Sequence, residues 1–219
     1  MTDRRLQAVL FDLDGLLVDT EPLWIRSAGE VLARRGHRWD LALRQRVMGR
    51  HPLEVARFMV EHYGLDDDPT ALMEERLELQ RGLYASEGIE PMPGALALVR
   101  QLVEAGIPRA VASGSPTALV ATCLEALDLR ASFSCAIGAD QVSRGKPAPD
   151  VFLAAASALG VEPRGCVVLE DANNGVAAAL AADMICVKVA REGRGATGAQ
   201  LARTSLEALD VSTLRGLFT

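Results

Sequence analysis

Two aspartates stand two residues apart where the first apolar run of the chain ends. Asp12 and Asp14 follow the segment AVLF and Leu13 lies between them, with Gly15 directly after. If the extended backbone continues through this segment, a spacing of two places both carboxylates on the same side. Closely spaced carboxylates repel each other, and each loses hydration free energy when it is buried. The pattern therefore predicts a site that holds a cation and in which one of the acids also reacts.

A second acid pair ends another apolar run. Glu170 and Asp171 close the segment CVVLED, so two separate strands are expected to finish in carboxylates. An oxygen-only set of ligands suits Mg²⁺, which binds a few carboxylates together with substrate phosphate and water. The three histidines lie outside these segments, which argues against zinc.

Two further segments carry groups that bind anions. VASGSP runs from an expected strand into a helix, where backbone N–H groups and the hydroxyls of Ser113 and Ser115 would form an anion cradle. Lys146, in the proline-stiffened loop RGKPAPD, would neutralise an anion as a point charge. Each has an ordinary alternative when taken singly, because serine commonly caps helices and a loop lysine is commonly solvated. Together with the acid pairs, they predict a site for Mg²⁺ and phosphate in which opposite charges offset each other.

Short apolar segments alternate with helical patterns after residue 94, and this order predicts a parallel sheet. Each apolar segment is short enough to be a buried strand, and Gly or Pro bounds most of the helical stretches. The expected strands cover 8–13, 107–113, 135–139, 166–171 and 184–190, and the expected helices cover 95–105, 117–127, 150–159 and 173–182. The expected fold class is α/β, a Rossmann-like doubly wound sheet with helices on both faces.

Residues 20–90 interrupt this alternation and predict an inserted small α-helical cap. The segment has no convincing strand, and its apolar residues recur at helical spacing, with Thr20 as the expected N-cap of the first helix. The chain leaves the sheet beside the first acid pair and returns near EPMPG. We therefore expect a core of residues 1–19 and 91–219, with the cap over the carboxyl ends of the strands, where open α/β sheets bind ligands.

The composition limits the class of protein. The 219 residues are 49% apolar and 24% charged, which is enough apolar material for a folded core. A formal net charge of −6 argues against a nucleic-acid partner and against binding to anionic membranes. The sequence has no apolar run of about 18 residues and no recognisable signal peptide. Four widely spaced cysteines without CxxC pairs favour reduced thiols and a cytoplasmic location.

Four segments in a fixed order carry a family resemblance. FDLDG, VASGS, GKPAPD and LEDANNG closely resemble the four signature motifs of the haloacid dehalogenase-like hydrolase superfamily. The resemblance covers essentially the whole chain, and the helical insertion after the first motif looks like the small cap of that superfamily. GLLVDTEPLW and GKPAPDVF are most similar to the branch that contains β-phosphoglucomutase and sugar-phosphate phosphatases such as 2-deoxyglucose-6-phosphatase.

The resemblance implies a catalytic role for each matched residue. Asp12 would be the nucleophile that forms an aspartyl-phosphate, and Asp14 would be the general acid and then the general base. Ser113 and Lys146 would hold the transferring phosphoryl oxygens, assisted by the backbone amide of Gly114. These are roles in positioning and electrostatic stabilisation, which phosphoryl transfer requires.

The resemblance also implies a magnesium site. Asp12, the backbone carbonyl of Asp14 and Asp171 would bind Mg²⁺ directly. Glu170 would bind through a water molecule or support the direct ligands. The implied cofactor is Mg²⁺ alone.

The reaction class follows from residues that match the family and from residues that depart from it. Asp14 favours phosphoryl transfer, because the dehalogenases of the superfamily lack this second acid. Where β-phosphoglucomutases are expected to carry a histidine, an arginine and a lysine, this sequence has Trp24, Pro52 and Pro116. Hydrolysis of a single phosphate ester is therefore favoured, while Arg50 and its neighbour could replace the missing charge and keep β-phosphoglucomutase as an alternative. A noncatalytic sensor of Mg²⁺ and phosphate is a third hypothesis, which the intact acids disfavour.

Substrate contacts are expected from the cap and from the loops beside the acids. The candidate residues are Glu21, Trp24, Arg50, Ser115 and Asn174. Trp24 has a packing alternative, because a tryptophan on the apolar face of a helix more often belongs to a core. The expected partner is a small-molecule phosphate ester, a sugar or sugar-alcohol phosphate. The sequence leaves the oligomeric state open, and a monomer is compatible with it.

Overall fold

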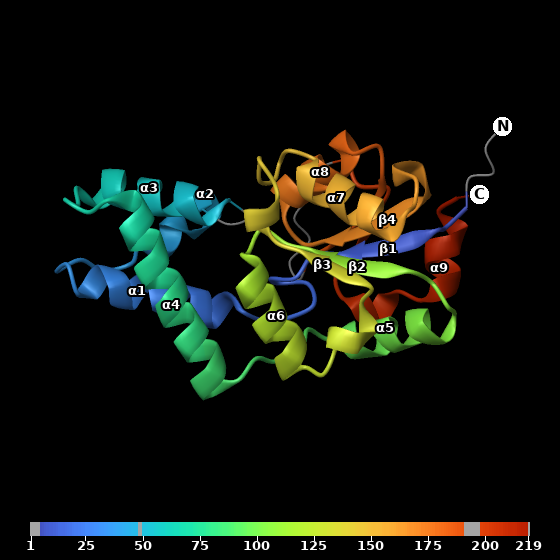
Figure 1. The fold of residues 1–219 in the computed structure, drawn as a ribbon, viewed down its shortest axis with the longest axis horizontal. Helices are drawn as coiled ribbons and strands as arrows, with labels where there is room; N and C mark the ends of the chain where they lie inside the picture. Colours follow the sequence, from blue (N-terminus) through green and yellow to red (C-terminus); the bar gives the residue numbers. More distant parts are fainter. Residues whose placement is uncertain (1–4, 48–49, 191–197, 219) are drawn as a thin grey trace.

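A parallel sheet forms the centre of the protein and confirms the expected α/β class. The computed structural model describes residues 5–47, 50–190 and 198–218. Within them the sheet has six strands in the order β3-β2-β1-β4-β5-β6, and every neighbouring pair is parallel (Figure 1). The strands are β1 (Ala8–Phe11), β2 (Arg109–Ala112), β3 (Cys135–Ile137), β4 (Cys166–Glu170), β5 (Ile185–Val189) and β6 (Leu201–Arg203).

Helices cover both faces of the sheet because its central strands are apolar on both sides. In β1, Val9 and Phe11 belong to one buried cluster, while Ala8 and Leu10 belong to a second cluster on the opposite face. The first cluster contains side chains of α5 (Ala95–Glu104), α6 (Thr117–Ala126) and α9 (Val211–Gly216). The second contains side chains of α7 (Asp150–Leu159) and α8 (Asn173–Ala181). Figure 1 shows these two helices together on one side of the sheet.

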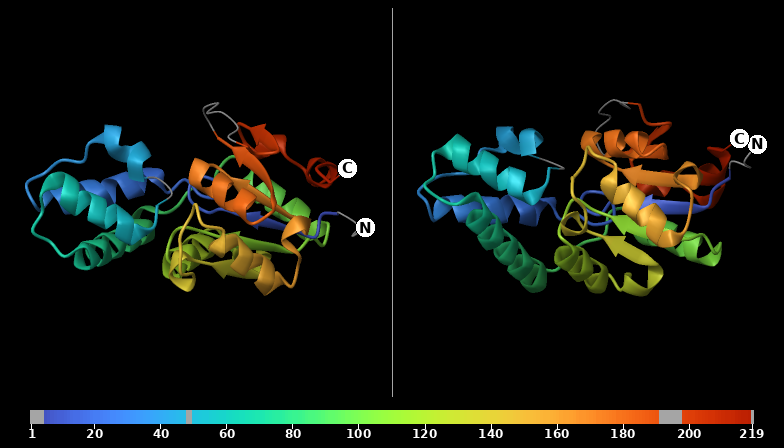
Figure 2. Two further views of the ribbon diagram at one scale, coloured as in Figure 1. Left: turned by 90° about the horizontal axis from the view of Figure 1, so that it is seen from above. Right: turned by 45° about the horizontal axis from the view of Figure 1, so that its top comes forward.

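The segment between β1 and α5 folds as helices that lie to one side of the sheet. These are α1 (Glu21–Ala33), α2 (Arg44–Val47), α3 (Pro52–Tyr63) and α4 (Pro69–Glu87). A third buried cluster, which includes Val31, Met59 and Leu72, joins α1, α3 and α4. The views of Figure 2 keep this helical group at the same end of the molecule. Its own apolar cluster explains why it folds apart from the helices that cover the sheet.

Two neighbouring chain segments connect the helical group to the sheet. The backbone N–H of Asp19 donates to the carbonyl of Glu90 at 2.9 Å, and that of Met92 donates to the carbonyl of Leu17 at 2.9 Å. An isolated β-bridge joins Val18 to Pro91. The segment that leaves the sheet and the segment that returns to it are therefore held side by side.

The structure differs from the sequence-based expectation at several element boundaries. The strands are shorter than expected, and β3 ends at Ile137 rather than at residue 139. Strand β6 and helix α9 were not expected, since each is short and β6 is a half-buried edge strand without a clear apolar pattern. Thr20 does occupy the N-cap position of α1, but its side chain makes no capping hydrogen bond. In the described part of the chain, no helix is long and apolar enough to cross a membrane.

Candidate active site

The three strands that carry the sequence motifs end at one edge of the sheet. Asp12 directly follows β1, Ser113 directly follows β2, and Asp171 directly follows β4. The N–H of Asp12 donates to the carbonyl of Leu169 on β4 at 3.0 Å, which fixes the two strand ends against each other. The chain runs from β1 outward to β2 and β3 and then crosses to β4 on the other side of β1. Ligands of open α/β sheets bind at such a switch point, so the topology explains where the acids meet.

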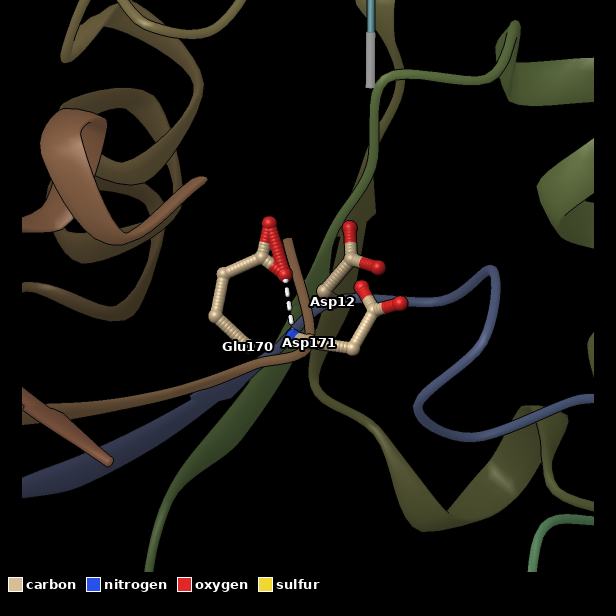
Figure 3. Close-up of side chains that lie close together, drawn as sticks. All are labelled: Asp12, Glu170 and Asp171. Atoms are coloured by element: carbon tan, nitrogen blue, oxygen red, sulfur yellow. Dashed lines mark hydrogen bonds between the residues drawn. The ribbon is translucent and has the colours of Figure 1, made fainter. Parts of the chain in front are cut away.

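Three carboxylates converge at this point. Asp12, Glu170 and Asp171 each offer an oxygen, and these oxygens all lie within 4.8 Å of one another (Figure 3). One oxygen of Glu170 accepts a hydrogen bond from the N–H of Asp171 at 2.8 Å, the dashed line in Figure 3. The donor set contains oxygen alone, which is the chemistry that Mg²⁺ prefers. The residues at the ends of β1 and β4 therefore fit this metal.

Lys146 supplies positive charge inside the same cluster. Its side chain is buried, and Nζ lies 2.5 Å from Asp12 Oδ1 and 3.3 Å from Glu170 Oε1. Burial opposes the charged form of Lys146, but the attraction of Asp12 and Glu170 outweighs it and raises the pKa of the lysine. Nζ also lies 4.8 Å from the centre of the Phe152 ring, a cation–π contact that holds the side chain.

The single positive charge of Lys146 does not offset the negative charge of the three carboxylates. Burial, followed by the charge of Glu170, raises the pKa of Asp12 to about 7 even with Lys146 beside it. The same two causes raise the pKa of Asp171 well above its ordinary value. A divalent cation in contact with these oxygens would favour their charged forms. Both the raised pKa values and the set of oxygen ligands therefore favour a divalent cation at this site.

Two glycines leave room for the acids. Gly15 has a φ of +83°, and a Cβ atom there would lie 2.5 Å from Asp171 Oδ2. A Cβ atom on Gly175 would lie 1.4 Å from Glu170 Oε1. Any larger residue at either position would push a carboxylate out of place. The glycines of FDLDG and DANNG therefore serve the acid cluster as well as the turns that contain them.

Three hydroxyl groups hold the second aspartate of the first motif. Thr20 Oγ1 donates to Asp14 Oδ1 at 2.6 Å, while Ser115 Oγ at 2.7 Å and Ser113 Oγ at 3.3 Å donate to Asp14 Oδ2. The Thr20 hydroxyl is used here instead of capping α1, and this corrects the expectation from sequence. Ser113 is fully buried and also accepts a hydrogen bond from the N–H of Ser115 at 2.9 Å.

A pocket lies above the acids, and residues of the helical group line its far side. From the expected residues it includes both aspartates of the first motif, the acid pair after β4, Lys146, Gly114, Ser115, Glu21, Trp24 and Arg50. Ser113 and Asn174 are not among the described residues that line it. Ser113 lies beneath the pocket against Asp14, and Asn174 lies in the first turn of α8. Their proposed contacts with phosphate and substrate stay predictions.

Sequence reasoning missed two polar residues of the pocket wall. Arg76 and Gln80 of α4 line the pocket, and each side chain is only 2% exposed. A signal was present, because both continue the spacing of four residues that starts at Leu72 and ends at Tyr84, all on the buried face of α4. Because charged residues in a helix are usually solvated, the polar residues within this apolar face did not by themselves predict a site.

Comparison with known proteins gives one family. The family model for haloacid dehalogenase-like hydrolases matches residues 6–183. Fructose-1-phosphate phosphatase YqaB of Escherichia coli (strain K12) is 37% identical over 185 residues, which cover 84% of this chain and 97% of that protein. Hexitol phosphatase B of the same strain is 33% identical over 220 residues, which cover 99% and 98% of the two chains.

Solved structures share the fold. The crystal structure of CbbY from Rhodobacter sphaeroides in complex with phosphate superposes with a TM-score of 0.85 at 28% identity, covering 95% of this chain and 99% of the other. A β-phosphoglucomutase structure from Clostridium difficile has a TM-score of 0.87 at 24% identity and covers 97% of each chain, a likeness of fold alone.

Proposed function

The chain belongs to the haloacid dehalogenase-like hydrolases, and on this premise we propose that it is a phosphatase that hydrolyses a small sugar or sugar-alcohol phosphate. The observation that carries the proposal is the convergence of Asp12, Asp171 and Lys146 at the switch point of the sheet, with Asp14 held beside them. The two curated relatives above are phosphatases of a sugar phosphate and of hexitol phosphates, and this supports the substrate class.

Magnesium is the proposed cofactor. Asp12, Asp171 and the backbone carbonyl of Asp14 would bind it, with Glu170 supporting them through its hydrogen bond to the N–H of Asp171. When bound, Mg²⁺ supplies positive charge that offsets the carboxylates and the phosphate oxygens. The site needs this charge because burial disfavours the ionised acids, as the raised pKa of Asp12 shows.

Asp12 is the proposed nucleophile. One of its carboxylate oxygens attacks phosphorus, the bond from phosphorus to the ester oxygen breaks, and an aspartyl-phosphate forms. Asp14 gives a proton to the departing alkoxide, so the product alcohol leaves neutral. A water molecule then attacks the aspartyl-phosphate, Asp14 takes its proton, and inorganic phosphate leaves with Asp12 restored.

The remaining groups hold the phosphoryl oxygens in this scheme. Lys146 already contacts Asp12, so its charge lies where the transferring group would arrive. The loop of Ser113 and Gly114 leads into α6, and the Gly114 N–H would donate to a phosphoryl oxygen there. The N–H groups of Ser113 and Ser115 already donate within the protein, to the carbonyl of Ile137 and to the Ser113 hydroxyl. Ser115 both lines the pocket and donates to Asp14, which links phosphate binding to the orientation of the acid.

A mutase remains a second candidate because of one observation in the pocket. Arg50 and Arg76 both line it, and they supply cationic groups that a second phosphate would need. Trp24 nevertheless lies in the pocket where a mutase is expected to carry a histidine, and an indole ring cannot transfer a proton in its place. Isomerisation of β-glucose 1-phosphate without release of phosphate would establish the mutase and exclude our proposal.

A substrate panel tests the phosphatase directly. The protein is incubated with Mg²⁺ and a panel of hexose, hexitol and glycerol phosphates, and inorganic phosphate is measured over time. We expect release from at least one ester, and loss of release with EDTA and with Asp12→Asn. The exposed Asp183, which pairs with Arg164 far from the pocket, provides the matched control Asp183→Asn. Release that persists undiminished after complete chelation would refute the magnesium-dependent mechanism.

The cysteines support the proposed location. Cys123, Cys135, Cys166 and Cys186 are all free thiols, and the surrounding burial raises the pKa of each. Unpaired, unreactive thiols suit a reducing compartment, so we propose the cytoplasm.

A further inference from the structure

Arg76 is a buried cation on the α4 wall of the pocket. Its side chain is 2% exposed, and it lines the same pocket as Asp12 and Asp14. Burial lowers the pKa of Arg76 to about 10, with nearby Tyr84 and Asp14 opposing the shift, so the guanidinium is charged at neutral pH. Among the described residues, no carboxylate lies within ion-pair distance of it. A buried arginine ordinarily has such a partner, because desolvation of an unpaired charge is costly.

The position of the guanidinium is fixed, although its hydrogen bonding is incomplete. Nη1 donates to Gln80 Oε1 at 3.4 Å, and Gln80 Nε2 in turn donates to the Tyr84 hydroxyl at 2.5 Å. The bond to Tyr84 orients the Gln80 oxygen toward Arg76. The guanidinium also lies over the Trp24 ring, 5.3 Å from its centre. In contrast, Nε is buried and has no hydrogen-bond partner among the described residues. Among the described residues only Nη1 has an acceptor, so an oxygen that enters the pocket beside Arg76 would find guanidinium N–H groups without a protein partner.

The charges of the pocket indicate which acceptor would bind. Its described lining carries five carboxylates and three basic side chains, and the substrate phosphate adds two negative charges. A single divalent cation offsets only part of this excess. A second anionic group on the substrate would therefore be repelled by the net negative charge of the pocket, whereas an uncharged oxygen would not be repelled.

We propose that Arg76 is a specificity-determining residue that donates a hydrogen bond to an uncharged oxygen, a hydroxyl or carbonyl, on the carbon chain of the substrate. The inference rests on the proposed phosphatase function. It assigns the residue that recognises the carbon chain of the substrate, on the far side of the ester oxygen from the phosphate. Trp24 lines the same pocket, so the part of its ring that Arg76 and Trp39 leave open would contact the C–H groups of the same chain. An aromatic face beside polar donors suits a sugar or polyol, whose C–H and O–H groups lie side by side.

Matched pairs of esters test this assignment. Glycerol 3-phosphate is compared with propyl phosphate, and a hexitol phosphate with hexyl phosphate, because the members of each pair differ in their hydroxyl groups. We expect the wild type to prefer the hydroxylated member. Arg76→Met should lower kcat/KM for the hydroxylated member by about 10- to 100-fold and for the alkyl member by less than about threefold. Arg76→Lys keeps a charge but lacks Nε and the planar fork, so its preference should be intermediate.

A control and a folding check separate the possible outcomes. Arg81 lies on the exposed side of α4, where it pairs with Glu78, so Arg81→Met should leave both rates unchanged. Thermal unfolding shows whether each variant is folded. If Arg76→Met is not folded, the test is whether Arg76→Lys has a reduced preference for the hydroxylated ester over the alkyl ester. Equal losses on both members, or no preference in the wild type, would overturn the inference. A larger loss on 2-phosphoglycolate than on glycerol 3-phosphate would also overturn it, because the recognised group would then be an anion. If the wild type releases phosphate from no ester at all, the proposed function itself fails.

Discussion

Three hydroxyl groups from two parts of the chain determine where the Asp14 carboxylate lies. Thr20 belongs to the segment that enters α1, whereas Ser113 and Ser115 follow β2. All three donate to Asp14, Thr20 to Oδ1 and the two serines to Oδ2, so both of its oxygens are held. An acid that protonates a leaving group must stay within hydrogen-bond reach of it, and these bonds restrict its rotation. Because Thr20 is also the first residue of the helical group, the same bond links Asp14 to the cap side of the pocket.

We predict that Thr20→Val lowers kcat while the binding of Mg²⁺ is unchanged. Valine has nearly the shape of threonine but cannot donate to Asp14, so the acid loses its shortest hydrogen bond. The expected loss in kcat is about tenfold, the value of one charge-assisted hydrogen bond used for positioning. Steady-state kinetics with the best ester of the panel measures it. Thr20→Ser retains the hydroxyl and should retain most of the rate; similar losses in both variants would contradict the prediction.

The turn after the first motif shows how one element is shaped by another. Gly15 adopts a left-handed φ, and its N–H donates to the carbonyl of Val18 at 2.8 Å to close the turn. The same glycine faces Asp171, which comes from the end of β4. Two requirements therefore act on this residue, a backbone one and a steric one. Gly64 at the end of α3 has a similar φ of +63° and no atom in the way of a Cβ.

We predict that alanine substitutions at these two glycines differ in their effect on the site. Gly64→Ala should lower the free energy of unfolding by about 1 kcal/mol, the cost of a left-handed φ, and should leave activity unchanged. Gly15→Ala should lower it further and weaken Mg²⁺ binding, because the new Cβ displaces the Asp171 carboxylate. Urea unfolding and calorimetric titration with Mg²⁺ measure the two quantities. Equal effects of both substitutions on Mg²⁺ binding would show that Asp171 is not displaced.

An ion-pair network ties α1 to α4 within the helical group. Arg35, just after α1, lies 2.6 Å from an Asp67 oxygen and 2.7 Å from a Glu75 oxygen through Nη2. The hydrogen bonds from Arg35 are the main reason that the pKa values of both acids are lowered. An acid with a lowered folded-state pKa stabilises the fold above its unfolded pKa, near 4, and loses this contribution as pH falls through the folded value.

We therefore predict that Arg35→Gln lowers the free energy of unfolding at pH 7 more than in strong acid. The side chains are partly exposed, so the loss at pH 7 should be at most about 1 kcal/mol. Denaturant unfolding at pH 7 and at about pH 3 gives the difference, which should shrink toward zero as the acids become protonated. A difference that grows in acid would show that the network is not stabilising through these charges.

At the scale of the whole molecule, the pocket has walls from two separately packed regions. Asp12 and Lys146 lie in loops of the region built around the sheet, while Trp24 and Arg76 belong to the helical group. The two regions are joined by the paired segments around Val18 and Pro91. We propose that residues 20–90 move as a unit about these segments, so that closure over the substrate excludes water until the ester bond has broken.

Small-angle scattering tests the proposed closure. With Mg²⁺ and fluoroberyllate, which mimics the phosphoryl group on an aspartate, we expect a smaller radius of gyration than for the free protein. The Asp12→Asn variant cannot hold the mimic and should show no change under the same conditions. An unchanged radius of gyration in the wild type, with calorimetry confirming that the mimic is bound, would exclude closure.

The sequence by itself determined which acids gather at the candidate site. Asp12 and Asp171 could be placed together because parallel strands end at one edge, and the apolar runs located those ends. Lys146 lies in a loop, and charge balance together with the family resemblance assigned it to the same site. The tertiary structure decided the rest of the pocket. Whether Arg76 and Gln80 face solvent or the site depends on how α4 packs against α1, α3 and α6, which no local pattern specifies. Likewise, the Thr20 hydroxyl could cap its own helix or reach Asp14, and only the tertiary position of Thr20 beside Asp14 decided between two bonds of similar free energy.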